Sequence, residues 1–167
     1  MTTSSESAQP QAIDAAAQER AAPAALRSLL SGRQLLAQKF QHFQNAFHEE
    51  GHLDARLLEL CRARIDTLHG ITAATDLDEA TAKQIARGDF SHFSQLEQQA
   101  LSVAEQIAID AHGVSDQQVH QLNELMGEAA TVSLMTAASM HDAGIRLQRV
   151  LSATTAQRNV APTSERG

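Results

Sequence analysis

Residues 48–52, His-Glu-Glu-Gly-His, match the His-Glu-x-x-His pattern in which two histidines bind zinc and the glutamate acts as a general base. That chemistry requires both histidines on one face of a continuous helix, and a further ligand. Gly51 lies inside the motif and favours a helix end. We therefore interpret the match as chance and predict no metal site and no cofactor. A surface site for a divalent cation among the eight histidines is the alternative.

A second polar group, His141-Asp142, lies in the middle of the most apolar segment of the chain, four residues before Arg146. Buried histidine, aspartate and arginine side chains need hydrogen-bonding or charged partners. These residues therefore either join subunits together or line a ligand pocket. We favour a structural or interface role, and His141 and Arg146 are the candidate pocket residues in the alternative that a ligand binds here.

Cys61 is the only cysteine, so the chain cannot form an internal disulfide. It shares one helix face with Leu57, Leu58, Ile65 and Leu68. This position predicts a small buried side chain. The alternative, a peroxidatic thiolate, has no residue nearby that could resolve a sulfenate.

The elements that must position these residues are predicted to be helices. Apolar residues recur at three- and four-residue spacing over 32–50, 54–69, 77–88, 94–112 and 115–127, and a helix from Pro23 precedes them. Ser94 with Glu97, and Ser115 with Gln118, match the capping box. Residues 128–152 are apolar or small nearly all round in their first half, which predicts a central, buried helix. No period-two alternation occurs, so we predict an all-α fold.

Composition restricts the partners of the protein. The chain has 167 residues, a formal net charge of −7 and only 3% aromatic residues, with no Trp or Tyr. These values argue against nucleic-acid binding, which requires clustered basic residues and favours aromatic stacking. No apolar run reaches transmembrane length and the N-terminus lacks a signal-peptide pattern, so we expect no membrane partner and a cytoplasmic location. We predict a mobile tail over 1–22, one domain over 23–152 and a second tail over 153–167.

The helix ELCRARIDTLHG (59–70), the junction after it and the segment 93–152 together resemble the carboxymuconolactone decarboxylase and alkylhydroperoxidase D family. The similarity covers about residues 34–152 and consists of helix pattern and cap positions, including the GVSDQ cap at 113–117. The resemblance implies an all-α domain of about six to seven helices that assembles as a trimer or hexamer.

Redox members of that family carry a glutamate, eleven further residues, and then Cys-x-x-Cys-x-x-x-His. Glu59 matches the glutamate, but Ile71 and Ala74 occupy the two cysteine positions and Asp78 occupies the histidine position. A thiol peroxidase needs a thiolate nucleophile and a resolving thiol. The resemblance therefore implies the family fold without the peroxidatic dithiol.

The candidate catalytic residues are Glu59, His69 and Asp78. Each has a structural alternative: Glu59 could pair with Arg56 or Arg62, and Asp78 could stabilise a helix N-terminus while His69 stabilises a helix C-terminus. We predict a non-catalytic oligomeric or small-molecule-binding protein of this family. The alternative is a non-redox acid–base enzyme acting on a small organic acid or lactone, and residual alkylhydroperoxidase activity is a more remote option. Whether the protein is an enzyme stays open, and a small carboxylate or lactone is the expected ligand.

Overall fold

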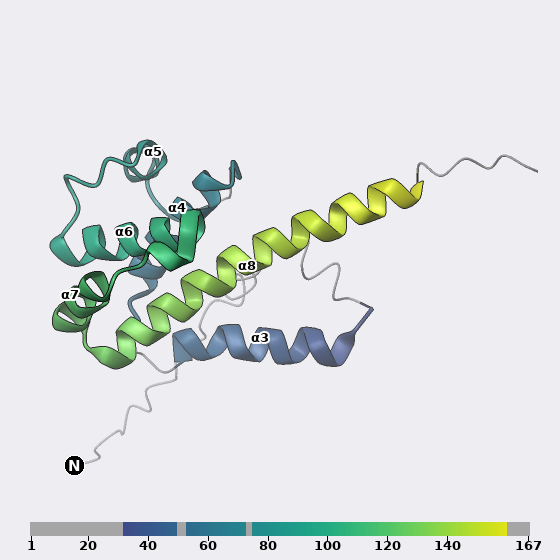
Figure 1. The fold of residues 1–167 in the computed structure, drawn as a ribbon, viewed down its shortest axis with the longest axis horizontal. Helices are drawn as coiled ribbons and strands as arrows, with labels where there is room; N and C mark the ends of the chain where they lie inside the picture. The colour runs from purple at the N-terminus through teal and green to yellow at the C-terminus, as the bar shows by residue number, and fades with distance from the viewer. Residues whose placement is uncertain (1–31, 50–52, 73–74, 160–167) are drawn as a thin grey trace, which may run out of the picture.

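The computed structural model describes residues 32–49, 53–72 and 75–159 (Figure 1). Their regular structure is entirely helical, with no strand, so the all-α prediction is confirmed. The helices are α3 (Gln34–Glu49), α4 (Ala55–Leu68), α5 (Glu79–Arg87), α6 (Gln95–Asp110), the 3-10 helix η1 (Ala111–Gly113), α7 (Asp116–Met126) and α8 (Glu128–Asn159). The tail predicted over 1–22 and the helix predicted from Pro23 lie outside these residues.

Both predicted capping boxes are present. The Ser94 hydroxyl accepts a hydrogen bond from the Glu97 amide at 3.3 Å, and the Glu97 carboxylate accepts one from the Ser94 amide at 2.9 Å. Ser115 and Gln118 repeat the arrangement with the same two distances. These contacts satisfy amides that have no partner within the helix, and they fix where α6 and α7 begin.

The core lies where α4, α6, α7 and α8 pack against one another. The predicted apolar face of α4 is buried at Leu57, Leu58, Cys61 and Ile65, whereas Leu68 at the helix end is partly exposed. A smaller cluster joins Leu60 of α4 to Ile85 of α5 and to Phe93 and Leu101. Both α4 and α6 contribute to the two clusters, and α5 packs mainly against α4.

Helix α8 differs from its prediction in two ways. It continues through Asn159, beyond Ser152, where the domain was predicted to end. Its first half is buried on one face only, at residues such as Leu134 and Ala138, while Val132 is 59% exposed. The small residues of this segment therefore do not identify an all-round buried helix, because α4, α6 and α7 cover just one side of it.

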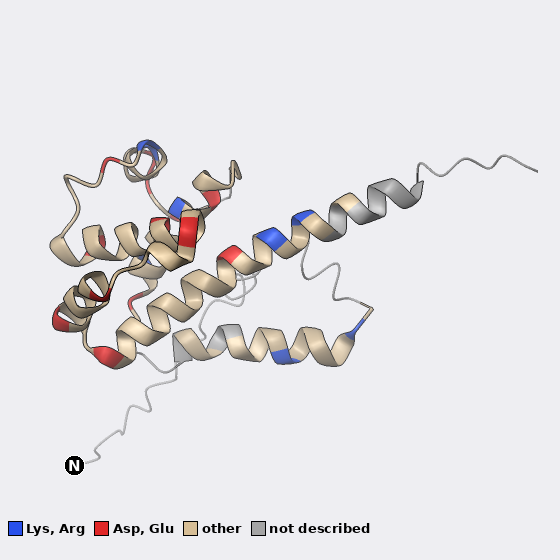
Figure 2. Cartoon of the chain, in the orientation of Figure 1, with Lys and Arg blue, Asp and Glu red and all other residues tan. Residues whose placement is uncertain are grey.

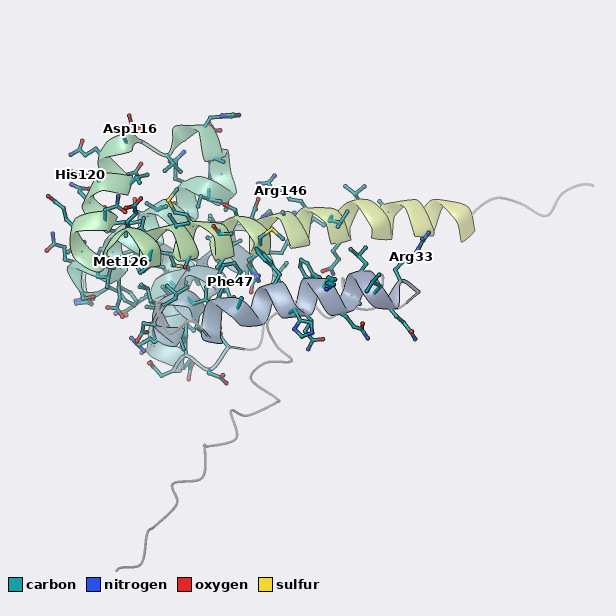
Figure 3. All side chains as sticks on the ribbon, turned by 90° about the horizontal axis from the view of Figure 1, so that it is seen from below. Arg33, Phe47, Asp116, His120, Met126 and Arg146 are labelled. Atoms are coloured by element: carbon teal, nitrogen blue, oxygen red, sulfur yellow. The ribbon has the colours of Figure 1, made fainter. Side chains whose placement is uncertain are left out.

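Helix α3 lies alongside the part of α8 that extends away from the other helices (Figures 1 and 3). Its Phe43 and Phe47 rings pack edge to face, with centroids 5.1 Å apart, while Leu35 and Leu36 are exposed. Figure 2 shows Lys and Arg on both of these helices and most of the acidic residues on the bundle of α4 to α7. Across the described ranges, no helix has both the length and the hydrophobicity to cross a bilayer.

Candidate functional site

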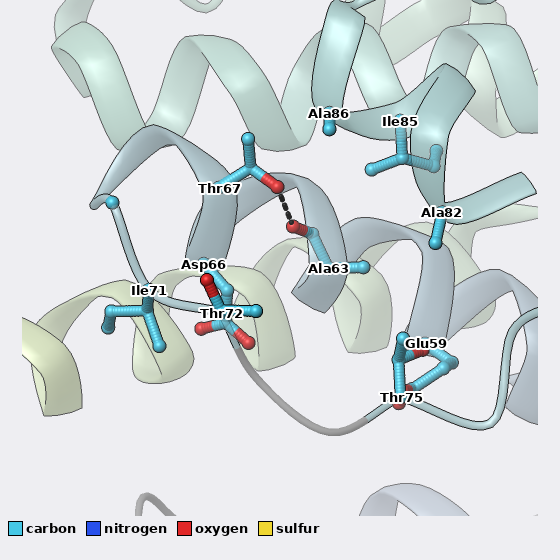
Figure 4. Close-up of a pocket in the computed structure, with 11 residues that line it drawn as sticks. Glu59, Ala63, Asp66, Thr67, Ile71, Thr72, Thr75, Ala82, Ile85 and Ala86 are labelled. Carbon is cyan, nitrogen blue, oxygen red and sulfur yellow. Dashed lines mark hydrogen bonds between the residues drawn. The ribbon is translucent and has the colours of Figure 1, made fainter. Parts of the chain in front are cut away.

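A cavity of about 350 Å³ lies between α4, the segment after it and α5 (Figure 4). It opens at the junction where the resemblance places the family's reactive segment. Its volume falls within the range of small-molecule sites. The lining residues are Glu59, Ala63, Asp66, Thr67, Gly70, Ile71, Thr72, Thr75, Ala82, Ile85 and Ala86.

The α4 wall of the cavity follows from helical spacing. Glu59, Ala63, Asp66 and Thr67 occupy positions i, i+4, i+7 and i+8 of the helix, which places them on one face. The Thr67 hydroxyl donates to the Ala63 carbonyl at 2.9 Å, so its oxygen lone pairs remain available to accept from a ligand. No motif in the sequence marks Asp66 or Thr67 as a site residue, although their helical spacing places them on the same face as Glu59.

The opposite wall is apolar and comes from α5. Ala82, Ile85 and Ala86 present methyl groups from two successive turns of the helix. Asp78 does not line the cavity. Its carboxylate accepts from the Thr81 amide at 2.9 Å and from the Thr81 hydroxyl at 2.6 Å, and these hydrogen bonds lower the pKa of Asp78. Asp78 is therefore the N-cap of α5, which was the structural alternative considered for it.

Arg64 of α4 fixes the other end of α5. Its Nη1 donates to the Ile85 carbonyl at 2.9 Å, and its Nε donates to Glu105 of α6 at 3.1 Å. The guanidinium also lies over the Phe90 ring, 5.5 Å from the centroid. A Cβ at Gly88, which has φ +72°, would lie 3.1 Å from Nη2. The apolar wall is thus attached to α4 and α6 by one buried side chain.

Glu59 is the candidate catalytic residue that lines the cavity. Arg56, one of its two expected partners, instead donates to Glu97 at 3.2 Å. Arg62, the other expected partner, interacts with Glu59 through its charge. Burial lowers the pKa of the Arg62 guanidinium, and the negative charges of Glu59 and Asp66 oppose that effect. Within the described part of the chain, the Glu59 carboxylate has no hydrogen-bond partner.

Asp66 lines the same cavity but is already paired. Its Oδ1 lies 2.8 Å from Nε2 of His141. His141, a candidate pocket residue, therefore contacts a lining residue of the cavity but does not line the cavity itself. The His141 Nδ1 atom is buried and has no hydrogen-bond partner among the residues that the structure describes. The pair connects α8 to the polar wall of the cavity.

His69 faces α8 and does not line the cavity. Its Nε2 lies 2.6 Å from Oδ1 of Asp142, and the other carboxylate oxygen of Asp142 accepts from Nε of Arg146 at 2.7 Å. Arg146 also donates to the Ala108 carbonyl at 2.6 Å, and Arg149 donates to the His69 carbonyl. The structure therefore brings His69 and Arg146 together through Asp142, in a network that connects α4, α6 and α8.

Thiol chemistry has no support at this site. Ile71 packs against the core at the first of the family's cysteine positions, and Ala74, at the second, lies outside the described residues. Cys61 is fully buried, as predicted, and burial raises the pKa of its thiol to about 12. A thiol with that pKa is protonated at neutral pH and is a poor nucleophile.

Metal ligands do not converge in the described ranges, where no group of three His, Cys, Asp or Glu side chains could hold an ion. The His-Glu-Glu-Gly-His motif cannot be placed, because residues 50–52 lie outside those ranges.

Compared with known proteins, the chain matches no family model, and it has no significant match among curated proteins or solved structures. The resemblance to the carboxymuconolactone decarboxylase and alkylhydroperoxidase D family therefore rests on the residue pattern given above.

Proposed function

We propose that this protein is a carboxymuconolactone decarboxylase-like or alkylhydroperoxidase D-like protein that binds a small molecule and lacks the peroxidatic dithiol. The observation that carries the proposal is the cavity of about 350 Å³, where the Glu59 carboxylate faces an apolar wall on α5. A concave, mostly apolar site with a few convergent polar groups is the usual form of a small-molecule site. The homo-oligomer, trimeric or hexameric, belongs to the same proposal.

A thermal-shift screen of small molecules tests this function, because selective binding stabilises the native state. The matched pair of variants is Ala82→Phe, which fills the cavity from α5, and Ala80→Phe, which adds the same ring to an exposed position of that helix. Hits should lose their effect in Ala82→Phe and keep it in Ala80→Phe. Hits that survive in both variants would place binding elsewhere and contradict the proposal.

The second candidate is a non-redox acid–base enzyme, which the Glu59 carboxylate favours because it faces the cavity without a hydrogen-bond partner in the described residues. A general base must reach the proton it abstracts, and a carboxylate already bonded elsewhere is less available for this. Turnover of a lactone or organic acid that disappears in Glu59→Gln, with binding retained, would establish this alternative. Binding without turnover for every ligand found would exclude it.

A further inference from the structure

A carboxylate ligand requires positive charges and hydrogen-bond donors, whereas the charged groups that line the cavity are negative and accept hydrogen bonds. Among the residues that the structure describes, no Lys, Arg or His lines the cavity, whereas the carboxylates of Glu59 and Asp66 do. A bound carboxylate would bring a third negative charge to this wall, and like charges at short distance repel strongly where water is partly excluded. The expected ligand class, a small carboxylate or lactone, is therefore not the class that this lining favours.

We propose that the cavity binds a small organic cation, an amine carrying an aliphatic or aromatic body, with its ammonium group on the Glu59 carboxylate. This inference rests on the proposed function, because it names the ligand class of that same cavity. An ammonium group carries three donors and no acceptor. It therefore complements a wall of carboxylate oxygens and hydroxyl lone pairs.

Glu59 is the carboxylate that a ligand reaches without displacing a protein partner. Oδ1 of Asp66 already lies at hydrogen-bonding distance, 2.8 Å, from Nε2 of His141, and Arg56 is bonded to Glu97. Arg62 lies on the same helix and interacts with both Glu59 and Asp66 through its charge, but it does not line the cavity. The positive charge of Arg62 is thus shared between two carboxylates. Glu59 therefore remains available to accept a hydrogen bond from a ligand.

The rest of the cavity suits the body of such a ligand. Ala82, Ile85 and Ala86 face Glu59 across the cavity and offer carbon atoms only, since the backbone carbonyl of Ile85 is bonded to Arg64 (Figure 4). The Thr75 hydroxyl, which also lines the cavity, accepts from the Leu77 amide at 3.1 Å. An amine with a ring or short alkyl chain can therefore place its charge on α4 and its carbon atoms against α5.

Three probes of one shape separate charge from size: benzylamine, benzyl alcohol and benzoate, titrated into the full chain by calorimetry at neutral pH. Benzylamine should bind more tightly than benzyl alcohol, and benzoate should bind weakest. Glu59→Gln keeps the shape of the side chain and removes its charge, so it should weaken benzylamine binding by about three- to tenfold and leave benzyl alcohol unchanged. The control Glu124→Gln removes a carboxylate from the exposed face of α7 and should change neither affinity.

The outcomes distinguish the ligand class from the proposed function. If all three probes bind equally, or benzoate binds best, and Ala82→Phe abolishes their binding, the cavity is a binding site but the cation preference is wrong. If benzylamine binding survives in Glu59→Gln at full strength, the assigned contact is wrong. If none of the probes binds to the folded protein, this inference fails, and the proposed function then depends on the wider screen.

Discussion

Nε2 of His69 lies 2.6 Å from Oδ1 of Asp142, although the two residues are 73 positions apart in the sequence. Both side chains are about nine-tenths buried where α4 ends against α8. Asp142 also accepts from Arg146, whose pKa is raised by that hydrogen bond and by the carboxylate charge. This contact connects the C-terminal end of the cavity's main helix to the longest helix of the fold.

Removing the charge of Asp142 should therefore destabilise the protein. In Asp142→Asn, His69 and Arg146 lose a charged acceptor, and hydrogen bonds to charged groups contribute about 1.5–3 kcal/mol. Arg146 is 53% exposed, so water screens its share and most of the loss arises at His69. Urea unfolding measures the difference, with Asp116→Asn at the exposed start of α7 as the control. Equal midpoints for Asp142→Asn and wild type would contradict a stabilising role.

The Cys61 thiol should be inert in the native state. It is fully buried and its pKa is about 12, so a disulfide reagent at pH 8 should modify it only after unfolding in denaturant. Peroxide consumption with a dithiol donor should likewise equal that of Cys61→Ser. Stoichiometric modification within seconds under native conditions would disprove the burial, and turnover above the variant would restore the peroxidase option.

The same thiol predicts a loss of stability in alkali. In the unfolded chain the thiol has its ordinary pKa, whereas in the native state its pKa is about 12. At a pH between these two values, the native state therefore binds more protons than the unfolded state. Stability from this group is complete below the unfolded pKa and falls as pH rises above it. Between pH 8.5 and 10, wild type should lose about 1 kcal/mol more than Cys61→Ala in denaturant titrations. Parallel losses in the two proteins would refute this.

Gly88 should resist substitution. Its φ of +72° lies in the left-handed region, and an added Cβ would press on the Arg64 guanidinium that holds α5. Gly88→Ala should destabilise the protein by about 1–2 kcal/mol. Gly32→Ala, whose Cβ would meet nothing within 4 Å, is the control. If both variants melt at the wild-type temperature, Gly88 is not conformationally required.

The two capping boxes should respond differently to acid. Partial burial raises the pKa of Glu97, but hydrogen bonds from Ser94 and the contact with Arg56 outweigh it, so the pKa is lowered overall. Stability from this carboxylate is present above its unfolded pKa and lost as pH falls through its folded pKa. Glu97→Gln should therefore cost a few tenths of a kcal/mol at pH 7 and nothing at acid pH, measured by chemical denaturation. Gln118→Glu, at the same position of the other box, should acquire that pH dependence.

Local patterns predicted most of the fold. Helix ends at Ser94, Ser115 and Gly88 follow from cap residues whose effect acts within one turn, and they occur where predicted. The end of α8 was not predictable in the same way, because its last turns carry no glycine or proline to stop them before Asn159.

The candidate site was predicted less completely. Glu59 was recognised from its place in a motif, and the structure puts it in the cavity. The partners of His69 and His141 depend on the angle at which α8 crosses α4, and no local sequence pattern predicts that crossing angle. A polar residue in a helix shows that a partner is needed, but its spacing does not show which residue of a distant helix supplies it.

Arg64 holds the apolar wall of the cavity although it is not itself a lining residue. The distance between α5 and Glu59 therefore depends on Glu105 and Phe90 as much as on the residues lining the cavity. A change at either position can alter the size of molecule admitted while every lining residue stays the same. Under the proposed function, two proteins with identical cavity residues can thus differ in specificity, and directed evolution of this protein should include the Arg64 contacts among its target positions.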